Sequence, residues 1–183
     1  KRSLSSFPTE NLKAYESFLR ARYLADKVTK EDYKQSIELF MNAIELDPNF
    51  ADAYIELALT YLYNYNIDMN NWNQNLIKST QLVDKAILIN PNLSKAYVAR
   101  GILSYLNGKT EEVKENFEKA LVLNPNEVIA HRDIAVYYTI ENSIDLNKSL
   151  FHINRAAELD PFSSTINSIK INRPSVILIF IKI

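Results

Sequence analysis

Apolar residues recur along most of this chain with the spacing of helices that bury one side. Phe117, Ala120 and Leu121 fall on one such stripe. The pattern predicts two helices in each of four successive units. The first helices cover about 11–26, 51–65, 93–107 and 127–141. The second helices cover about 31–47, 72–90, 110–124 and 145–160.

Four prolines punctuate this pattern, and they are 43, 34 and 36 residues apart. Each one follows Asp or Asn, which the proline ring pushes out of the helical region. Proline also favours the start of the next helix. An alanine five residues earlier lets a neighbouring helix approach closely. The alanine and proline pairs are Ala43 and Pro48, Ala86 and Pro91, Ala120 and Pro125, and Ala156 and Pro161.

A helical unit of about 34 residues with this punctuation resembles the tetratricopeptide repeat. The third unit fits the family without a gap. Its signature positions hold Tyr97, Gly101, Phe117, Ala120 and Pro125. It departs from the family's usual Leu, Tyr and Ala at Arg100, Ser104 and Val113. The second and fourth units match with extra residues in 63–75 and near 142–145, and the first unit matches more loosely.

The resemblance implies an all-α fold, a right-handed α-α superhelix of four helix-turn-helix repeats with an irregular C-terminal tail. One hairpin cannot bury its own apolar face, so neighbouring hairpins must stack. We expect a linker at 1–10 and a repeat domain at 11–169, with repeats at about 11–50, 51–92, 93–126 and 127–162. Residues 163–183 would form a partial fifth repeat or an aberrant tail.

The long second repeat and two stretches carry a narrower resemblance: "PTENLKAYESFLRARYLADK" at 8–27 and "AELDPFSSTINSI" at 157–169. They resemble the C-terminal repeat region of bacterial signalling proteins. Those proteins carry cyclase, kinase or winged-helix DNA-binding domains upstream, and none of these domains is present in this chain. The first residue is Lys rather than Met, which indicates a processed product or a piece of a longer protein.

The repeat pattern stops after Ile169, and the stretch "VILIFIKI" at 176–183 is β-prone and nearly uncharged. Such a segment tends to aggregate when it is exposed. The favoured interpretation is a truncated or altered end that replaces missing repeats. A strand or plug that covers the open end of the solenoid is a second interpretation, and a membrane or partner anchor is a third.

Composition narrows the possible partners. The chain has 47% hydrophobic and 23% charged residues, a formal net charge of -1, two glycines and no cysteine. The charge provides no field to attract nucleic acid. No apolar run reaches the roughly 20 residues of a membrane-spanning helix. We therefore expect a protein or peptide partner, no nucleic acid and no membrane insertion. A cytoplasmic location is favoured over a periplasmic one, although cysteine content does not decide between them.

No constellation of residues predicts catalysis, a cofactor or a metal. A site at His131 and His152 would need a third ligand such as Asp133 or Asp145, and we expect His131 to be packed instead. The stretch "NIDMNN" at 66–71 lacks the alternating acidic ligands of a calcium loop. The carboxylates of one helix should form a solvated face: Glu111, Glu112, Glu115 and Glu118.

The remaining candidate is the concave wall that the family's architecture implies, which first helices line. The predicted groove residues are Ile55, Leu59, Leu62, Tyr63, Lys95, Val98, Ile102, Tyr105, Arg132 and Val136. An exposed apolar strip of this kind usually marks a binding surface. It could instead pack on the chain's own tail or on an upstream domain. Ile55, Leu59 and Ala99 replace the polar clamp that family members use to hold chaperone C-termini, which argues against that partner.

These observations predict a non-catalytic protein-interaction module that binds a peptide or partner domain, within a bacterial signalling or regulatory protein. The alternative is a structural module that self-associates, for example as a homodimer, or packs on its own upstream domain. A hidden enzyme is a third hypothesis. The missing nucleophile and acid-base pairs count against it.

Overall fold

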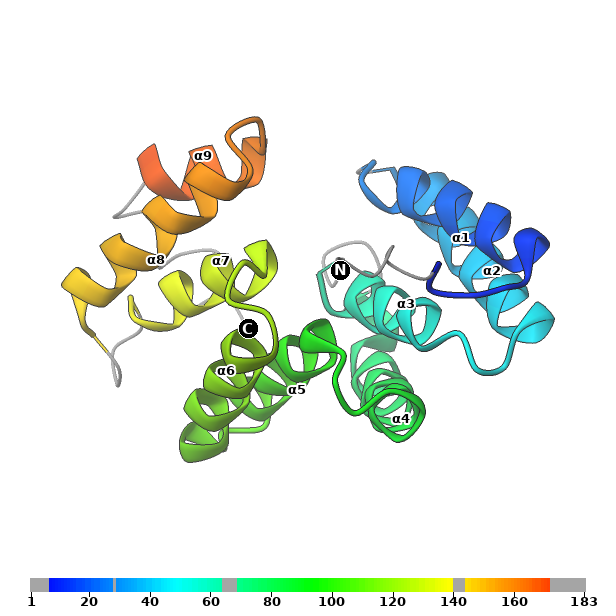
Figure 1. The fold of residues 1–183 in the computed structure, drawn as a ribbon, viewed down its shortest axis with the longest axis horizontal. Coiled ribbons are helices and arrows are strands. Elements are labelled where there is room, and N and C mark those ends of the chain that lie inside the picture. Colours follow the sequence, from blue (N-terminus) through cyan, green and yellow to red (C-terminus); the bar gives the residue numbers. More distant parts are fainter. Residues whose placement is uncertain (1–6, 28, 64–68, 140–143, 172–183) are drawn as a thin grey trace, which may run out of the picture.

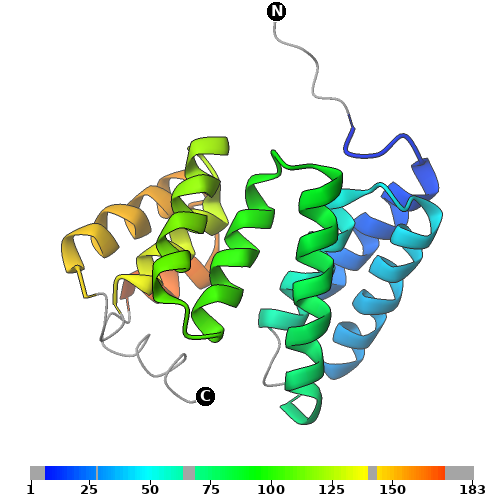
Figure 2. The ribbon, with the colours of Figure 1, turned by 90° about the horizontal axis from the view of Figure 1, so that it is seen from below.

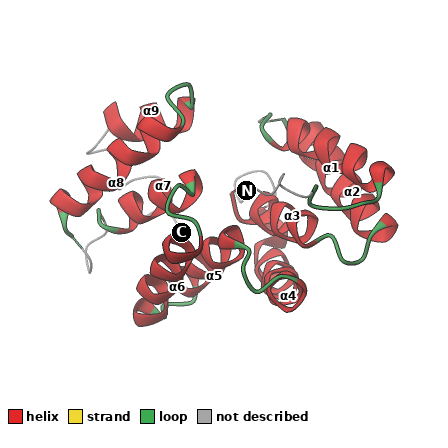
Figure 3. Ribbon diagram, viewed as in Figure 1, coloured by secondary structure: helices red, strands yellow, loops and turns green. Residues whose placement is uncertain are grey.

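The computed structural model describes residues 7–27, 29–63, 69–139 and 144–171. Within these ranges the chain forms helices and contains no strand (Figure 3), so the all-α prediction is confirmed. The elements are α1 (Leu12–Ala25), α2 (Lys30–Leu46), α3 (Ala51–Tyr63), η1 (Met69–Asn71), α4 (Trp72–Ile89), α5 (Ser94–Leu106), α6 (Thr110–Leu123), α7 (Val128–Tyr137), α8 (Leu146–Leu159) and α9 (Ser164–Ile171).

Successive helices pair into antiparallel hairpins that stack into an arc (Figures 1 and 2). The hairpins are α1–α2, α3–α4, α5–α6 and α7–α8, and both helices of each hairpin contact the first helix of the next. In Figure 1, α3, α5 and α7 lie on the inside of the arc and α4, α6 and α8 on its outside. The predicted solenoid is therefore confirmed, because no single closed interior joins all the described helices.

Most helix ends fall within two residues of the predicted ones, and α7 is the clear exception. It ends at Tyr137 rather than near residue 141. The amide of Thr139 donates a hydrogen bond to Val136 O at 2.9 Å. The amide of Asp145 donates one to Tyr138 O at 3.0 Å, so the backbone turns after α7. Part of the expected insertion, 64–68, and the tail stretch 176–183 lie outside the described residues.

The Asp-Pro and Asn-Pro pairs form the same turn after each second helix. The residue before proline is extended, with φ of -142° at Asp47, -135° at Asn90, -142° at Asn124 and -137° at Asp160. In the first three turns its side-chain oxygen accepts the amide hydrogen two residues later, at 2.9 to 3.1 Å. These side-chain turns replace the helical bonds that proline cannot make.

A second bond fixes the next helix onto each turn. The sixth residue after each proline donates a side-chain hydrogen bond to that proline's carbonyl. The four bonds are Tyr54 to Pro48 at 3.2 Å, Tyr97 to Pro91 at 3.0 Å, His131 to Pro125 at 3.1 Å and Asn167 to Pro161 at 3.2 Å. The turn before α9 therefore has the geometry of the turns that begin complete hairpins.

Small residues allow the helices of each hairpin to pack closely. The four alanines that precede the turns are fully buried. A Cβ atom placed on Gly101 would lie 2.6 Å from the Phe117 ring, so the α5–α6 hairpin needs glycine there. His131 is buried at 5% exposure, as the sequence predicts.

Candidate functional site

The structure places the ten predicted groove residues on α3, α5 and α7, but it buries half of them. Tyr63 is 38% exposed. Lys95, Ile102, Tyr105 and Arg132 are half-buried. The expectation of an exposed apolar strip is wrong for five residues whose exposure is 6% or less: Ile55, Leu59, Leu62, Val98 and Val136.

Tight curvature explains this burial. The Tyr63 hydroxyl, at the end of α3, donates to Asp133 on α7 at 2.7 Å. The second and fourth hairpins therefore touch across the third. Inward apolar side chains pack into the clusters between neighbouring hairpins and do not line an open channel. We call the surface formed by the inward faces of α3, α5 and α7 the inner wall.

The inner wall holds a connected polar group at Tyr63, Arg132 and Asp133. Arg132 Nε donates to Asp133 at 2.8 Å, and its guanidinium lies 4.6 Å from the centre of the Tyr63 ring. Burial lowers the pKa of Arg132, but the Asp133 carboxylate and the Tyr63 hydroxyl outweigh it and keep the pKa above its ordinary value. Burial also raises the pKa of Tyr63 well above 10.0, so its hydroxyl remains a donor at neutral pH.

A second charged pair joins the second and third hairpins. Lys95 on α5 contacts Glu56 on α3 at 2.6 Å, and both side chains are partly covered. Burial raises the pKa of nearby Asp52, although the positive charge of Lys95 opposes the rise. The inner wall thus presents oriented charges and aromatic rings rather than the continuous apolar strip that the sequence predicts.

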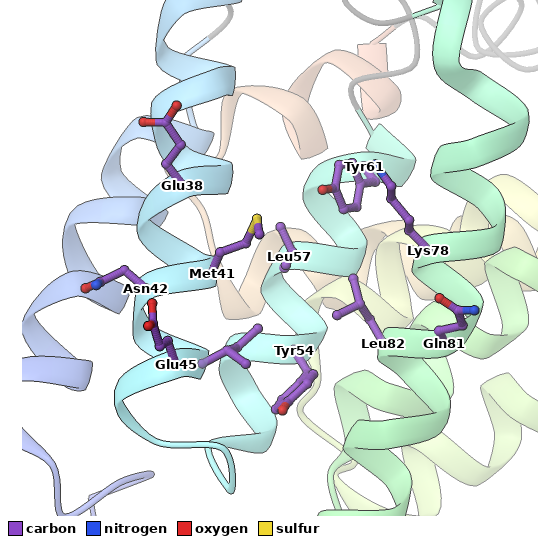
Figure 4. Close-up of a pocket in the computed structure, with 11 residues that line it drawn as sticks. Glu38, Met41, Asn42, Glu45, Tyr54, Leu57, Tyr61, Lys78, Gln81 and Leu82 are labelled. Carbon is purple, nitrogen blue, oxygen red and sulfur yellow. The ribbon is translucent and has the colours of Figure 1, made fainter.

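The structure also shows a hollow that sequence reasoning missed, between α2 and α4 on the outer side. Its volume is about 740 Å³, and we call it the outer groove. Figure 4 shows Tyr54, Leu57 and Tyr61 of α3 between the two flanking helices, with Met41 on the α2 side and Leu82 on the α4 side. A concave, largely apolar surface of this size is typical of ligand sites.

The outer groove continues into a second hollow of about 380 Å³. Glu38, Tyr61 and Lys78 line both hollows. Lys30 and Lys34 of α2 join Lys78 at this end, whereas Glu45 lines the opposite end. The groove therefore has a basic end and an acidic end.

Polar side chains cross the corresponding gap between α4 and α6. That hollow has a volume of about 280 Å³. Arg100 forms an ion pair with Asp84, and the Ser104 hydroxyl bonds Glu112 at 3.1 Å. Arg100 and Ser104 occupy the positions that Leu57 and Tyr61 hold one repeat earlier. The departures from the family pattern in the third repeat were thus the sequence signal for this difference.

The two histidines meet in the last hairpin. Their Nδ1 atoms are 2.9 Å apart. Because His131 Nε2 donates to Pro125 O, neutral His131 must accept at Nδ1, so His152 donates. Burial, then His131 and Lys148, lower the pKa of His152 to about 4. No group of three potential metal ligands occurs in the part of the chain that the structure describes.

The carboxylates at 111, 112, 115 and 118 are exposed, as predicted for a solvated face. Among the described helices, none combines the length and the apolar character that a bilayer span requires.

Comparison with protein families matches one part of the chain, residues 27–74. Residues 39–74 and 27–50 each match a family described as "Tetratricopeptide repeat". Anaphase-promoting complex subunit 3 of Schizosaccharomyces pombe is 27% identical over 135 residues, 74% of this chain and 19% of that protein. Mitochondrial import receptor subunit TOM70 of Rattus norvegicus is 28% identical over 112 residues, 61% of this chain and 17% of that protein.

Human protein O-mannosyl-transferase TMTC3 is 32% identical over 120 residues, 65% of this chain and 12% of that protein. The chain spans less than a fifth of the length of each of these relatives.

Two solved structures share the fold at low identity. One is TTC0263, a tetratricopeptide repeat protein of Thermus thermophilus, with a TM-score of 0.52, 16% identity, and coverage of 90% of this chain and 99% of that chain. The other is a double mutant of MamA, with a TM-score of 0.51, 18% identity, and coverage of 84% and 78%. The chain is therefore an all-α solenoid with the fold of tetratricopeptide repeat proteins, and its residues 27–74 match that family.

Proposed function

We propose that this chain is a non-catalytic module that binds a peptide or partner domain on its inner wall. One observation carries the proposal. Three successive hairpins present accessible or half-buried aromatic, apolar and charged side chains on one surface: Tyr63, Lys95, Ile102, Tyr105 and Arg132. Bonds between repeats hold the charged members in fixed orientations. A partner would therefore meet a preorganised surface, which lowers the entropic cost of binding.

Two further observations support a protein partner. The relatives named above include a subunit of a complex and an import receptor. Lys95 and Arg132 of the inner wall are each held in an ion pair with a carboxylate, which fixes the charges that a partner would meet. The transferase relative does not change this proposal, because the chain spans 12% of it.

The host of the module, we propose, is a bacterial signalling or regulatory protein. The stretches at 8–27 and 157–169, which resemble the repeat regions of such proteins, support this context.

To test this proposal, the purified chain is immobilised and incubated with extracts of the source cells, and the proteins that it retains are measured. Ile102→Asp with Tyr105→Asp should abolish retention because the charges disrupt the apolar contact. Circular dichroism should show unchanged helicity, and the milder Tyr105→Ala guards against misfolding. Leu88→Asp is the matched control, since Leu88 is 78% exposed on the outer helix α4. Retention that survives both inner-wall variants would rule the site out.

A second candidate function is self-association through the last hairpin. Large apolar side chains are exposed there: Ile144 at 60%, Leu146 at 67%, Phe151 at 65% and Phe162 at 94%. Association of two copies through α8 and its flanking residues would bury such side chains. Sedimentation equilibrium tests this candidate. A concentration-dependent dimer that Phe151→Ser with Phe162→Ser converts to a monomer would favour it over capture of a different partner.

A further inference from the structure

We propose that the outer groove between α2 and α4 is a second docking site, for an amphipathic helix of a partner protein that has acidic residues at one end. This site lies on the opposite side of the hairpins from the inner wall, and its argument is independent of the function proposed above.

The floor of the outer groove supplies the apolar contact. Tyr54, Leu57 and Tyr61 of α3 lie between the flanking helices (Figure 4). Met41 is 56% exposed at the rim, although it lines a largely apolar hollow. An exposed methionine beside a hollow of about 740 Å³ is a surface that an apolar side chain of a partner would cover.

The corresponding hollow one repeat later is smaller and is lined by charged side chains. One repeat later, Arg100 and Ser104 replace Leu57 and Tyr61 and bond Asp84 and Glu112 across the gap. At the equivalent positions the outer groove has Leu57 and Tyr61, with Lys78 lying 5.6 Å from the centre of the Tyr61 ring, and its hollow is larger.

The charged residues at the two ends of the outer groove determine which kind of partner helix it can bind. Three lysines, Lys30, Lys34 and Lys78, line one end of the groove with a single carboxylate, Glu38, so this end is net positive. None of the ion pairs among the described residues involves these lysines, whereas Lys95 and Lys148 are both paired. Glu45 stands at the other end. Acidic residues at the lysine end of a bound helix would therefore be attracted, and basic residues there repelled.

The length of the groove suits a helix of about four turns. Its lining residues run from Lys30 to Glu45 along α2. At about 1.5 Å per residue this corresponds to about 22 Å. The chain's own terminal residues 172–183 contain Arg173 and Lys182 and no acidic residue, so they lack the required charge.

Two labelled synthetic peptides of about 16 residues, four helical turns, test the proposal. Both peptides carry the same stripe of leucines along one helix face. The acidic peptide has two Glu residues at one end, and the basic peptide has two Lys residues at the same positions. Fluorescence anisotropy with the full chain should show saturable binding of the acidic peptide, at least about fivefold tighter than the basic one. No saturable binding, or no preference between the peptides, would overturn the proposal.

Variants locate the binding. Met41→Asp should lower the affinity for the acidic peptide by about tenfold or more, because it places a charge in an apolar contact. Lys34→Glu with Lys78→Glu should reverse the preference toward the basic peptide. Leu88→Asp, on α4 outside the groove, should change neither affinity. Binding that Met41→Asp leaves intact would place the peptide elsewhere and overturn the proposal.

A unique thiol adds a direct readout, because the chain has no cysteine. Gln81→Cys lines the groove, so it should react with a peptide that carries a thiol-reactive group, whereas Leu88→Cys should not. Equal reaction at both positions would count against the groove.

The experiments separate this site from the inner wall and from other occupants. Met41→Asp should leave partner retention by the inner wall unchanged, and Ile102→Asp with Tyr105→Asp should leave peptide affinity unchanged. A dimer that Met41→Asp abolishes would assign the groove to a second copy of the chain. Displacement of the peptide by a single-stranded oligonucleotide would assign it to nucleic acid. Either result would overturn a partner helix.

Discussion

At the scale of single residues, the second, third and fourth hairpins each pack a small side chain of the first helix against a larger side chain of the second helix. Gly101 faces Phe117 in the third repeat. The second and fourth repeats place a slightly larger residue with a slightly smaller one in the same cluster: Ala58 with Val83, and Ala135 with Ile153. The two facing side chains together must fill the space between the helices without overlap, because protein interiors are tightly packed.

Gly101→Ala should therefore destabilise the chain by about 1 to 3 kcal/mol, since the new methyl group overlaps the Phe117 ring. Urea denaturation measures the loss. Gly101→Ala with Phe117→Val copies the pairing of the second repeat, so it should lose less than the sum of the two single variants. An unchanged unfolding midpoint for Gly101→Ala would contradict this account of the contact.

The histidine pair predicts a pH dependence. The pKa of His152 is lowered from 6.5 to about 4, so the unfolded chain binds a proton in this range that the folded chain does not. The contribution to stability is complete above about pH 6.5 and is lost as pH falls toward 4. His152 is partly exposed, so we expect the loss to be only about 1 to 2 kcal/mol.

The measurement compares the unfolding free energies of the native chain and His152→Gln at about pH 7.5 and 4.5, on either side of this titration. The decrease between the two values should be smaller in the variant, while the carboxylates contribute equally to both proteins. Equal decreases would show that His152 does not titrate as described.

At the scale of elements, the turns could be predicted from the sequence and the helix caps could not. Proline after Asp or Asn restricts the backbone whatever the surroundings, so four such pairs located the boundaries between hairpins. The helix starts are more varied. Asn11, Thr29 and Asp145 cap α1, α2 and α8 through their side chains. Helices α4 to α7 have no such bond, and α5 and α7 are instead tied to the preceding turn by Tyr97 and His131.

Asn11→Ala should cost about 1 to 2 kcal/mol, the upper part of the range for helix caps. Its side chain accepts hydrogen bonds from Lys13 N and Ala14 N at 3.1 Å and donates to Leu46 O at 2.8 Å, so it joins both ends of the first hairpin. Asn73→Ala, on the exposed side of α4, is the control and should change stability by less than about 0.5 kcal/mol. Equal effects in thermal unfolding would show that the cap contributes little.

At the scale of the whole molecule, the order in which the hairpins stack could be predicted from the sequence, but the curvature of the solenoid could not. The period of the repeat establishes which helices are neighbours. It does not establish how far each hairpin rotates on the last, which depends on individual side chains such as Tyr63 and Asp133. The sequence therefore overestimated the exposure of Ile55, Leu59 and Val98. The outer groove was missed because the period says nothing about the space between second helices.

Tyr63→Phe should relax the curvature, because it removes the hydrogen bond between the second and fourth hairpins. The expected cost is about 0.5 to 1.5 kcal/mol. Small-angle scattering should show a larger radius of gyration. Tyr97→Phe removes a bond of 3.0 Å between residues only six apart in the chain, so it should lower stability without a change in radius. An unchanged radius for Tyr63→Phe would mean that other contacts set the curvature.

The bond from Asn167 to the Pro161 carbonyl has a practical consequence. It seats α9 on the preceding turn by the same device that seats α3, α5 and α7, so the direction in which a following hairpin would grow is already defined. A designed second helix joined to α9 should complete a fifth hairpin, and further hairpins should then continue the spiral in register. The scaffold could in this way be lengthened by whole hairpins while its existing surfaces stay where they are.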